Sequence, residues 1–221
     1  MKHDIILSWS GGKDCAFALS EMKHNQDYQI KRLLTTIDRD TGQVNMHGIP
    51  RSLLEKQASS LGIQLDLVEL PSNPSNKEYE SIMQKQLGFY QSQAIHHIAF
   101  ADLFLEDVRH YRMQQMQKAG MQAVFPIWKR NTRELARTFV ERGFKAIITC
   151  TDSTQMESKY TGRQFDDDFL DSLPESVDPC GENGEFHSFV YDGPDYEKAI
   201  LYDKAEIYSN DGRFYFLEFK I

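Results

Sequence analysis

The residues best suited to chemistry lie near the amino terminus, in the segment SWSGGKDC (residues 8–15). Glycines 11 and 12 let the backbone approach an anion closely, and Lys13 adds a positive charge beside them. A carboxylate at Asp14 suits a phosphate loop only if Mg²⁺ bridges it to the phosphates. The spacing is neither that of a Walker loop nor that of a dinucleotide fingerprint. We therefore predict nucleotide contacts from Ser8, Ser10, Gly11, Gly12, Lys13, Asp14 and Cys15, with Asp14 as the metal ligand.

A second group of reactive side chains lies far along the chain, in DPCGENGEFH (residues 178–187). Closely spaced carboxylates with an imidazole could bind ammonium, remove its proton and attract a cationic substrate. Composition alone favours a plainer interpretation, a solvated acidic turn that leads into a strand. Under the functional hypothesis, the catalytic candidates are Glu182, Glu185 and His187, together with Lys13 and Asp14. The substrate-binding candidates in this segment are Asp178, Gly181 and Asn183.

A folded protein must position both reactive segments, and the composition of the chain limits the class of that protein. The chain has 221 residues, 40% of them hydrophobic and 26% charged, as is typical of globular proteins. A net charge of −8 disfavours nucleic acid as a partner. We also expect no membrane span and no signal peptide. The cysteines (Cys15, Cys150 and Cys180) form no CxxC pair, which argues against a disulfide framework and favours a cytoplasmic location.

Residues 1–126 alternate between two periodicities. Apolar strands such as DIILSW (4–9) and IKRLLTTID (30–38) are each followed by a helical pattern, such as KDCAFALSEMKH (13–24). Regular alternation with short links predicts a parallel sheet with helices on both faces. The first part of the chain is therefore expected to be a Rossmann-like α/β domain.

The pattern changes at about residue 127. A helix (132–143) and a strand (144–152) are followed by an acidic stretch, a glycine-rich turn and a terminal hairpin around SNDG (209–212). We predict a smaller, mixed α+β domain over residues 127–221, beside a nucleotide-binding domain over residues 1–126.

Further binding candidates follow from the expected strand ends, where sheets of this type bind ligands. Ile37 ends the second strand and Asp102 follows the fourth, so both are predicted to contact the nucleotide. His47 and Arg109 are predicted to bind substrate. His47 is equally compatible with a plain loop residue, and Arg109 with a carboxylate pair near a helix start.

A resemblance narrows these predictions. SGGKD after a first strand resembles the loop of the ATP-pyrophosphatase (PP-loop) superfamily, which is adenine nucleotide alpha-hydrolase-like. The segments MHGIP (46–50), FADLFLEDVRHYR (100–112) and DPCGENGEFHSFVYDGP (178–194) resemble, in the same order, the diphthine–ammonia ligase family. Cys15 departs from the superfamily pattern, which has serine at that position.

The resemblance implies a HUP-type sheet and an enzyme that uses ATP and Mg²⁺. It also implies that residues 1–126 form the ATP-binding PP-loop domain and that residues 127–221 bind the acceptor substrate. Such a ligase joins a carboxylate to ammonium through an acyl adenylate and releases AMP and pyrophosphate. The implied acceptor is diphthine on the translocating elongation factor, and a homodimer is left open.

Three alternatives remain at this point. The first is a PP-loop ATP pyrophosphatase that adenylates a different acceptor. The second is an ATP-binding sensor without turnover, and the third is a redox or sulfur-transfer protein that uses Cys180. A nucleophilic Cys15 is a further idea, because a helix N-terminus lowers the pKa of a thiol.

Overall fold

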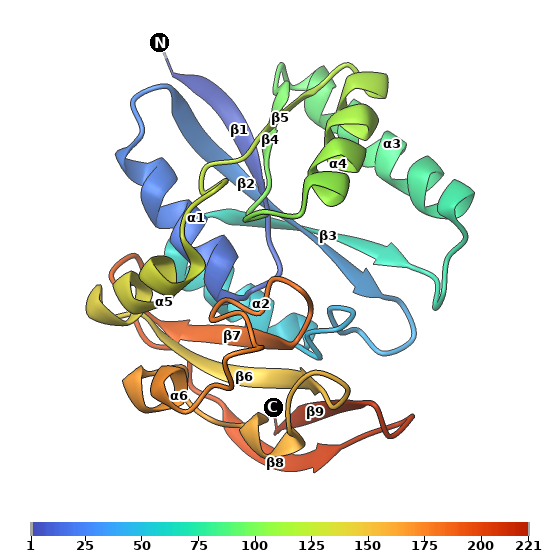
Figure 1. Cartoon of the computed structure of the whole chain (residues 1–221). Coiled ribbons are helices and arrows are strands. Elements are labelled where there is room, and N and C mark those ends of the chain that lie inside the picture. Colours follow the sequence, from blue (N-terminus) through green and yellow to red (C-terminus); the bar gives the residue numbers. More distant parts are fainter. Residues whose placement is uncertain (1, 221) are drawn as a thin grey trace.

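The computed structural model describes residues 2–220, which form two β-sheets at different levels of the molecule (Figure 1). The first sheet has five strands in the order β3-β2-β1-β4-β5, and every neighbouring pair is parallel. Its strands are β1 (His3–Ser8), β2 (Tyr28–Asp38), β3 (Gln64–Leu70), β4 (His97–Ala99) and β5 (Gln122–Val124). This arrangement confirms the predicted Rossmann-like sheet.

Helices cover both faces of this sheet (Figure 1). They are α1 (Lys13–His24), α2 (Arg51–Leu61), α3 (Asn76–Ser92) and α4 (Glu106–Lys118). The first two pack in the larger apolar core, and the last two in a smaller core on the opposite face. After β1 the chain adds β2 and β3 on one side of β1, and it then adds β4 and β5 on the other side. The carboxyl ends of β1 and β4 therefore form the switch point where sheets of this kind bind ligands.

The second sheet is antiparallel, with the order β7-β6-β9-β8. Its strands are β6 (Lys145–Asp152), β7 (Phe186–Asp192), β8 (Asp203–Tyr208) and β9 (Phe214–Lys220). The accompanying helices are α5 (Thr132–Glu141), a 3₁₀ turn η1 (Ser158–Tyr160) and α6 (Asp167–Asp171). The mixed α+β character and the terminal hairpin were both predicted, and both are confirmed.

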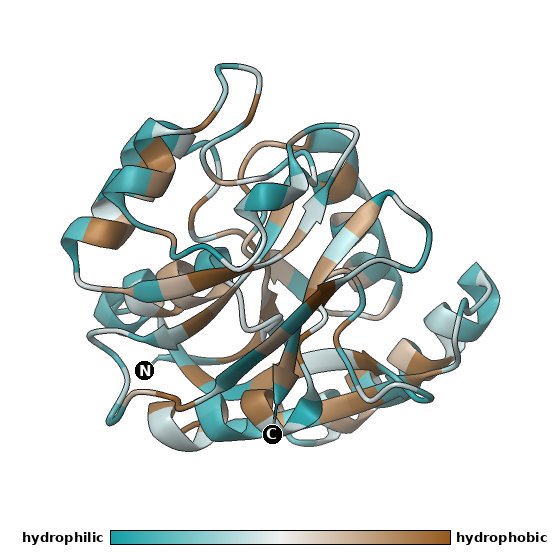
Figure 2. Cartoon of the chain, turned by 90° about the horizontal axis from the view of Figure 1, so that it is seen from below, coloured by the Kyte–Doolittle hydropathy of each residue, from teal (hydrophilic) through white to brown (hydrophobic). Residues whose placement is uncertain are grey.

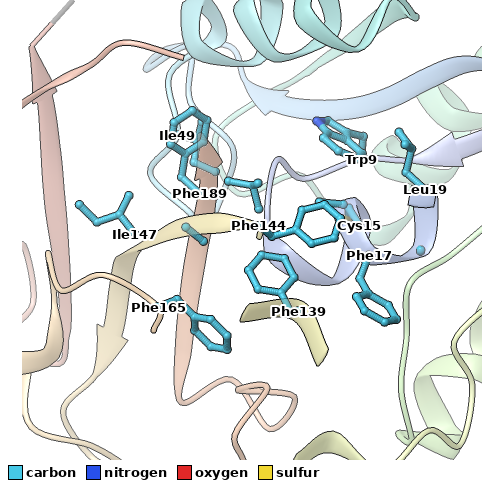
Figure 3. Close-up of a cluster of buried hydrophobic side chains, with 14 of the residues drawn as sticks. Trp9, Cys15, Phe17, Leu19, Ile49, Phe139, Phe144, Ile147, Phe165 and Phe189 are labelled. Carbon is cyan, nitrogen blue, oxygen red and sulfur yellow. The ribbon is translucent and has the colours of Figure 1, made fainter. Parts of the chain in front are cut away.

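One continuous apolar core joins the two sheets. Phe17 of α1 lies near Phe144, and Phe144 stacks on Phe139 of α5 with ring centroids 4.7 Å apart. Figure 3 shows these rings beside Trp9 and Cys15 of the amino-terminal loop, with Phe189 of the second sheet nearby. Because the core crosses between the sheets, a domain boundary at residues 126 and 127 stays a prediction.

The strands carry hydrophobic stretches, and hydrophilic residues predominate in the outer loops (Figure 2). Helix α4 is largely hydrophilic, and Met116 is its only buried side chain. Within residues 2–220, no helix is both long enough and apolar enough to cross a membrane.

Candidate active site

The predicted phosphate loop connects β1 to α1 and turns sharply at its glycines. Gly11 has φ +84°, a left-handed conformation that favours glycine. Gly12 is the N-cap residue of α1, and no side-chain hydrogen bond caps the helix there. A Cβ at Gly12 would lie 3.2 Å from both His47 Cε1 and the Ser188 carbonyl oxygen. The loop is therefore narrow, and it presents the amino-terminal N–H groups of α1.

A cavity of about 610 Å³ opens beside this loop, within the size range of small-molecule sites. Its walls come from the loop, from β2 and β4, from α3 and α4, and from the turn that precedes β7. The predicted residues that line it are Ser8, Ser10, Gly12, Lys13, Asp14, Cys15, His47, Asp102, Gly181, Glu182 and His187. The two reactive segments, which are far apart in the sequence, thus meet in one cavity.

Ile37 does not line this cavity, and its contact with the nucleotide stays a prediction. Ile37 is 2% exposed and packs in the larger core, on the face of the sheet that α1 and α2 cover. The residues of β2 that line the cavity are Leu34, Thr35 and Thr36. The strand itself was correctly predicted.

Arg109 also lies outside the cavity lining. Its guanidinium lies over the rings of Phe125 and Trp128, 5.3 and 4.8 Å from their centroids. Arg112, three residues further along α4, lines the cavity and donates from Nε to Asp102 Oδ2 at 2.6 Å. Arg112 was not among the predicted site residues, although the segment FADLFLEDVRHYR contains it.

The turn at residues 178–185 is held by its own carboxylates. Glu185 is 2% exposed and accepts from the backbone N–H groups of Asp178 and Asn183, at 2.9 and 3.0 Å. The Asn183 side-chain amide donates to the same carboxylate at 2.9 Å. Asp178 accepts from the backbone of Cys180 and Glu182. None of these three predicted residues lines the cavity, and their hydrogen bonds shape the turn. A catalytic role for Glu185 stays a prediction.

Glu182 is the carboxylate of this turn that reaches the cavity. Its Oε1 accepts from the backbone N–H of Leu103 at 2.7 Å and more weakly from that of Phe104 at 3.4 Å. Burial raises the pKa of Glu182 to about 7, and nearby Asp14 adds to the effect, while Lys13 and the two N–H groups oppose it. A carboxyl group that titrates near neutral pH is suited to general base catalysis.

Lys13 joins the loop to this turn. Its Nζ donates to the Asp14 carboxylate at 2.8 and 3.0 Å and to the Cys180 carbonyl oxygen, and it lies 5.4 Å from the Phe186 ring centroid. Burial disfavours the charged lysine, but the negative groups around it, Asp14 first, hold its pKa above the ordinary value. Burial raises the pKa of Asp14, against the effect of Lys13. The pair thus places one cation and one carboxylate at the cavity.

His47 and His187 form a pair of imidazoles beside the loop. Their ring centroids are 4.4 Å apart, and the Nδ1 of His47 is buried without a hydrogen-bond partner among the described residues. Burial lowers the pKa of His47 to about 4 and that of His187 well below its ordinary value, and Lys13 acts in the same direction. Both rings are therefore neutral at physiological pH and are poor acceptors of a proton from ammonium.

Cys15 lies inside the loop, where its Sγ is 3.4 Å from the backbone nitrogen of Ser10 and 3.3 Å from Ser10 Oγ. Burial raises the pKa of the thiol, so the nucleophilic thiolate is disfavoured. We expect Cys15→Ser to keep turnover within about threefold, because a hydroxyl accepts the same hydrogen bond. Steady-state kinetics with ATP would check this, and a loss above about 100-fold would restore the nucleophile hypothesis.

Two family models match the chain, one over each of the two parts that contribute to this site. A family model described as the diphthamide synthase N-terminal domain matches residues 1–123, more than half of the chain. The chain belongs to the diphthamide synthase family. A model of the family's C-terminal domain matches residues 131–218, which include the turn with Glu182. These matches confirm the resemblance found in the sequence.

Curated relatives of the family match over a shorter range. Human diphthine–ammonia ligase is 27% identical over 109 residues, which cover 47% of this chain and 41% of that protein. The mouse enzyme of the same name is 28% identical over 108 residues, covering 46% of this chain and 40% of the relative. The matched part thus spans about two fifths of the length of these relatives.

Proposed function

We propose that the protein is an ATP-dependent ligase that joins a carboxylate to ammonia and releases AMP and pyrophosphate. The observation that supports this proposal best is the shared cavity, in which the phosphate loop faces Glu182. A nucleotide-binding sensor would have no use for a carboxyl group whose burial raises its pKa to about 7.

The ATP half of the reaction belongs to the loop and the sheet. The N–H groups at the start of α1 and the Lys13 ammonium would stabilise the charge that develops on pyrophosphate. Leu34 and Thr36 would form part of the floor below the nucleoside. A carboxylate oxygen of the acceptor attacks the α-phosphorus, the bond to the β-phosphate oxygen breaks, and pyrophosphate leaves. The product is an acyl adenylate.

Magnesium fits this half of the cavity through a single protein carboxylate. Within the described residues, His, Cys, Asp and Glu side chains form no group of three or more that could hold a metal ion. Asp14, whose side chain is 26% exposed, lines the cavity and would hold Mg²⁺ together with the phosphates, the usual arrangement for this ion. Bound there, Mg²⁺ would neutralise charge on the triphosphate.

The ammonia half belongs to Glu182. Its carboxylate takes a proton from ammonium, and the ammonia attacks the carbonyl carbon of the acyl adenylate. AMP leaves with the bonding electrons, and the attacking nitrogen loses a second proton to solvent water to give the amide. The name of the curated relatives, diphthine–ammonia ligase, supports the carboxylate of diphthine as the acceptor. We infer that it is presented on the translocating elongation factor.

The test is a product assay with ATP, Mg²⁺, ammonium and an elongation factor that carries diphthine. We expect AMP, pyrophosphate and the amide in equal amounts, measured by ion-exchange chromatography and mass spectrometry. ADP and phosphate as the products would overturn the proposal. AMP formation that does not depend on the diphthine-bearing factor would favour a PP-loop enzyme with another acceptor.

A further inference from the structure

A buried glutamine outside the predicted site connects three segments of the protein. Gln57 on α2 is 0% exposed. Its Oε1 accepts from Trp9 Nε1 at 3.0 Å, and its Nε2 donates to the carbonyl oxygens of Gly11 at 3.0 Å and Val190 at 2.6 Å. Each polar atom of the amide thus has a partner, as a buried polar group requires.

These partners lie where geometry matters most to the proposed ATP site. Trp9 and Gly11 lie in the first half of the loop, and Val190 belongs to β7 of the second sheet. The N–H of Val190 also donates to the Gly11 carbonyl oxygen at 2.9 Å. A Cβ on Gly11 would lie 2.9 Å from Gln57 Oε1, so the glutamine fits closely against the left-handed glycine.

The same connection sets the position of the turn before β7. Ser188 is on β7, two residues before Val190, and its Oγ accepts from the Lys13 backbone N–H at 3.2 Å. His187, one residue earlier, reaches His47. Displacement of Val190 from Gly11 would therefore shift the residues of β7 that line the cavity relative to the loop.

We propose that Gln57 is a positioning residue that joins the phosphate loop and β7 into one unit and thereby sets the affinity for the ATP triphosphate. This inference rests on the proposed function only in requiring that the loop binds ATP. Gln57 does not line the cavity, so its effect is transmitted through Gly11 and Val190.

The first test replaces the amide with an apolar side chain of similar length. Gln57→Met removes all three hydrogen bonds and leaves the buried carbonyl oxygen of Val190 without this donor. We expect about tenfold weaker binding of α,β-methylene ATP with Mg²⁺, measured by isothermal titration calorimetry. Binding equal to that of the wild type would overturn the inference.

Gln57→Glu gives a readout that a purely structural role would not produce. The carboxylate keeps the acceptor for Trp9 but places negative charge against two carbonyl oxygens, whereas the protonated acid can donate to one of them. Affinity relative to the wild type, measured at each pH, should therefore be lowest at pH 8 and partly recover at pH 6. A ratio that does not change with pH contradicts the proposed hydrogen bonding.

Tyr90→Phe is the matched control for stability. Tyr90 is also 0% exposed, and it donates to Asp66 at 2.8 Å in the smaller core, apart from Gln57. We expect this variant to lower the melting temperature but to bind the analogue like the wild type. Equal losses of affinity in Tyr90→Phe and Gln57→Met would reduce Gln57 to a general stability role. If the wild type itself fails to bind the analogue, the proposed function falls and this inference falls with it.

Discussion

Replacing Glu182 by glutamine is expected to lower amide formation by about 10²–10⁴-fold, the range typical of a lost general base. In the wild type, the Leu103 N–H donates to Glu182 Oε1 at 2.7 Å, and the amide oxygen of the variant can still accept this hydrogen bond. The turn should therefore keep its shape, and the affinity for α,β-methylene ATP should stay nearly unchanged. An ammonium-dependent product assay beside a calorimetric titration would separate the two effects.

The raised pKa of Glu182 also predicts how the rate of amide formation and the stability of the fold change with pH. Burial raises the pKa of Glu182 to about 7, and the ionised form is the base, so the rate should rise through about pH 7 and level off above it. Between its ordinary pKa, 4.5, and about 7, the folded state holds a proton that the unfolded state has lost. Stability from this group therefore falls as pH rises through that window. Glu182→Gln should thus raise the melting temperature at pH 8 while it removes activity.

Two further carboxylates control for a general loss of negative charge. Glu80 also lines the cavity, on α3, and accepts from Gln115 at 3.0 Å. Glu80→Gln should keep most of the activity. Glu185→Gln should instead lower the melting temperature, because Glu185 holds the turn through the backbone of Asp178 and Asn183. If Glu80→Gln and Glu182→Gln lose equal activity, Glu182 is not the specific base.

Removal of the Lys13 ammonium is expected to have the largest effect on stability. Lys13 is 3% exposed, and its Nζ lies 2.8 Å from Asp14 Oδ2. Lys13→Met leaves the Asp14 carboxylate without its cation and the Cys180 carbonyl oxygen without its donor. Loss of one partner of a buried pair costs about 3–5 kcal/mol of unfolding free energy, and the 26% exposure of Asp14 favours the lower end. Urea denaturation would measure it.

The double variant Lys13→Met/Asp14→Asn provides the decisive comparison. It removes the unpaired charge as well, so it should recover part of the stability that Lys13→Met loses. Neither variant should recover turnover, because each lacks the cation that we propose contacts phosphate, a loss of roughly 10–100-fold or more. Lys118→Met, at another lysine of the cavity wall, should retain activity. Strictly additive effects of the two substitutions would mean that the pair has no coupling.

Local sequence patterns determined the secondary structure and the location of the loop. The helix of residues 13–24 was predicted with the limits that the structure has, since its apolar residues recur at helical spacing after a glycine pair. The parallel sheet followed from the strand–helix alternation, and the terminal hairpin from SNDG. These features depend on residues close together in the chain, so composition and spacing suffice to predict them.

Tertiary structure decided which members of each predicted segment serve the cavity. Leu34, Thr35 and Thr36 of β2 line the cavity, whereas Ile37 of the same strand packs in the larger core. Arg112 lines the cavity and donates to Asp102, whereas the Arg109 guanidinium packs on Phe125 and Trp128.

The same holds for the turn and for the residue that joins it to the loop. Glu182 and Glu185 belong to one short turn, but only the fold shows that the first reaches Leu103 and the second binds its own backbone. Gln57 had no signal at all in the sequence. Its role comes from hydrogen bonds to Gly11 and Val190, segments that meet only after both sheets pack on one core, and no local pattern encodes such a meeting.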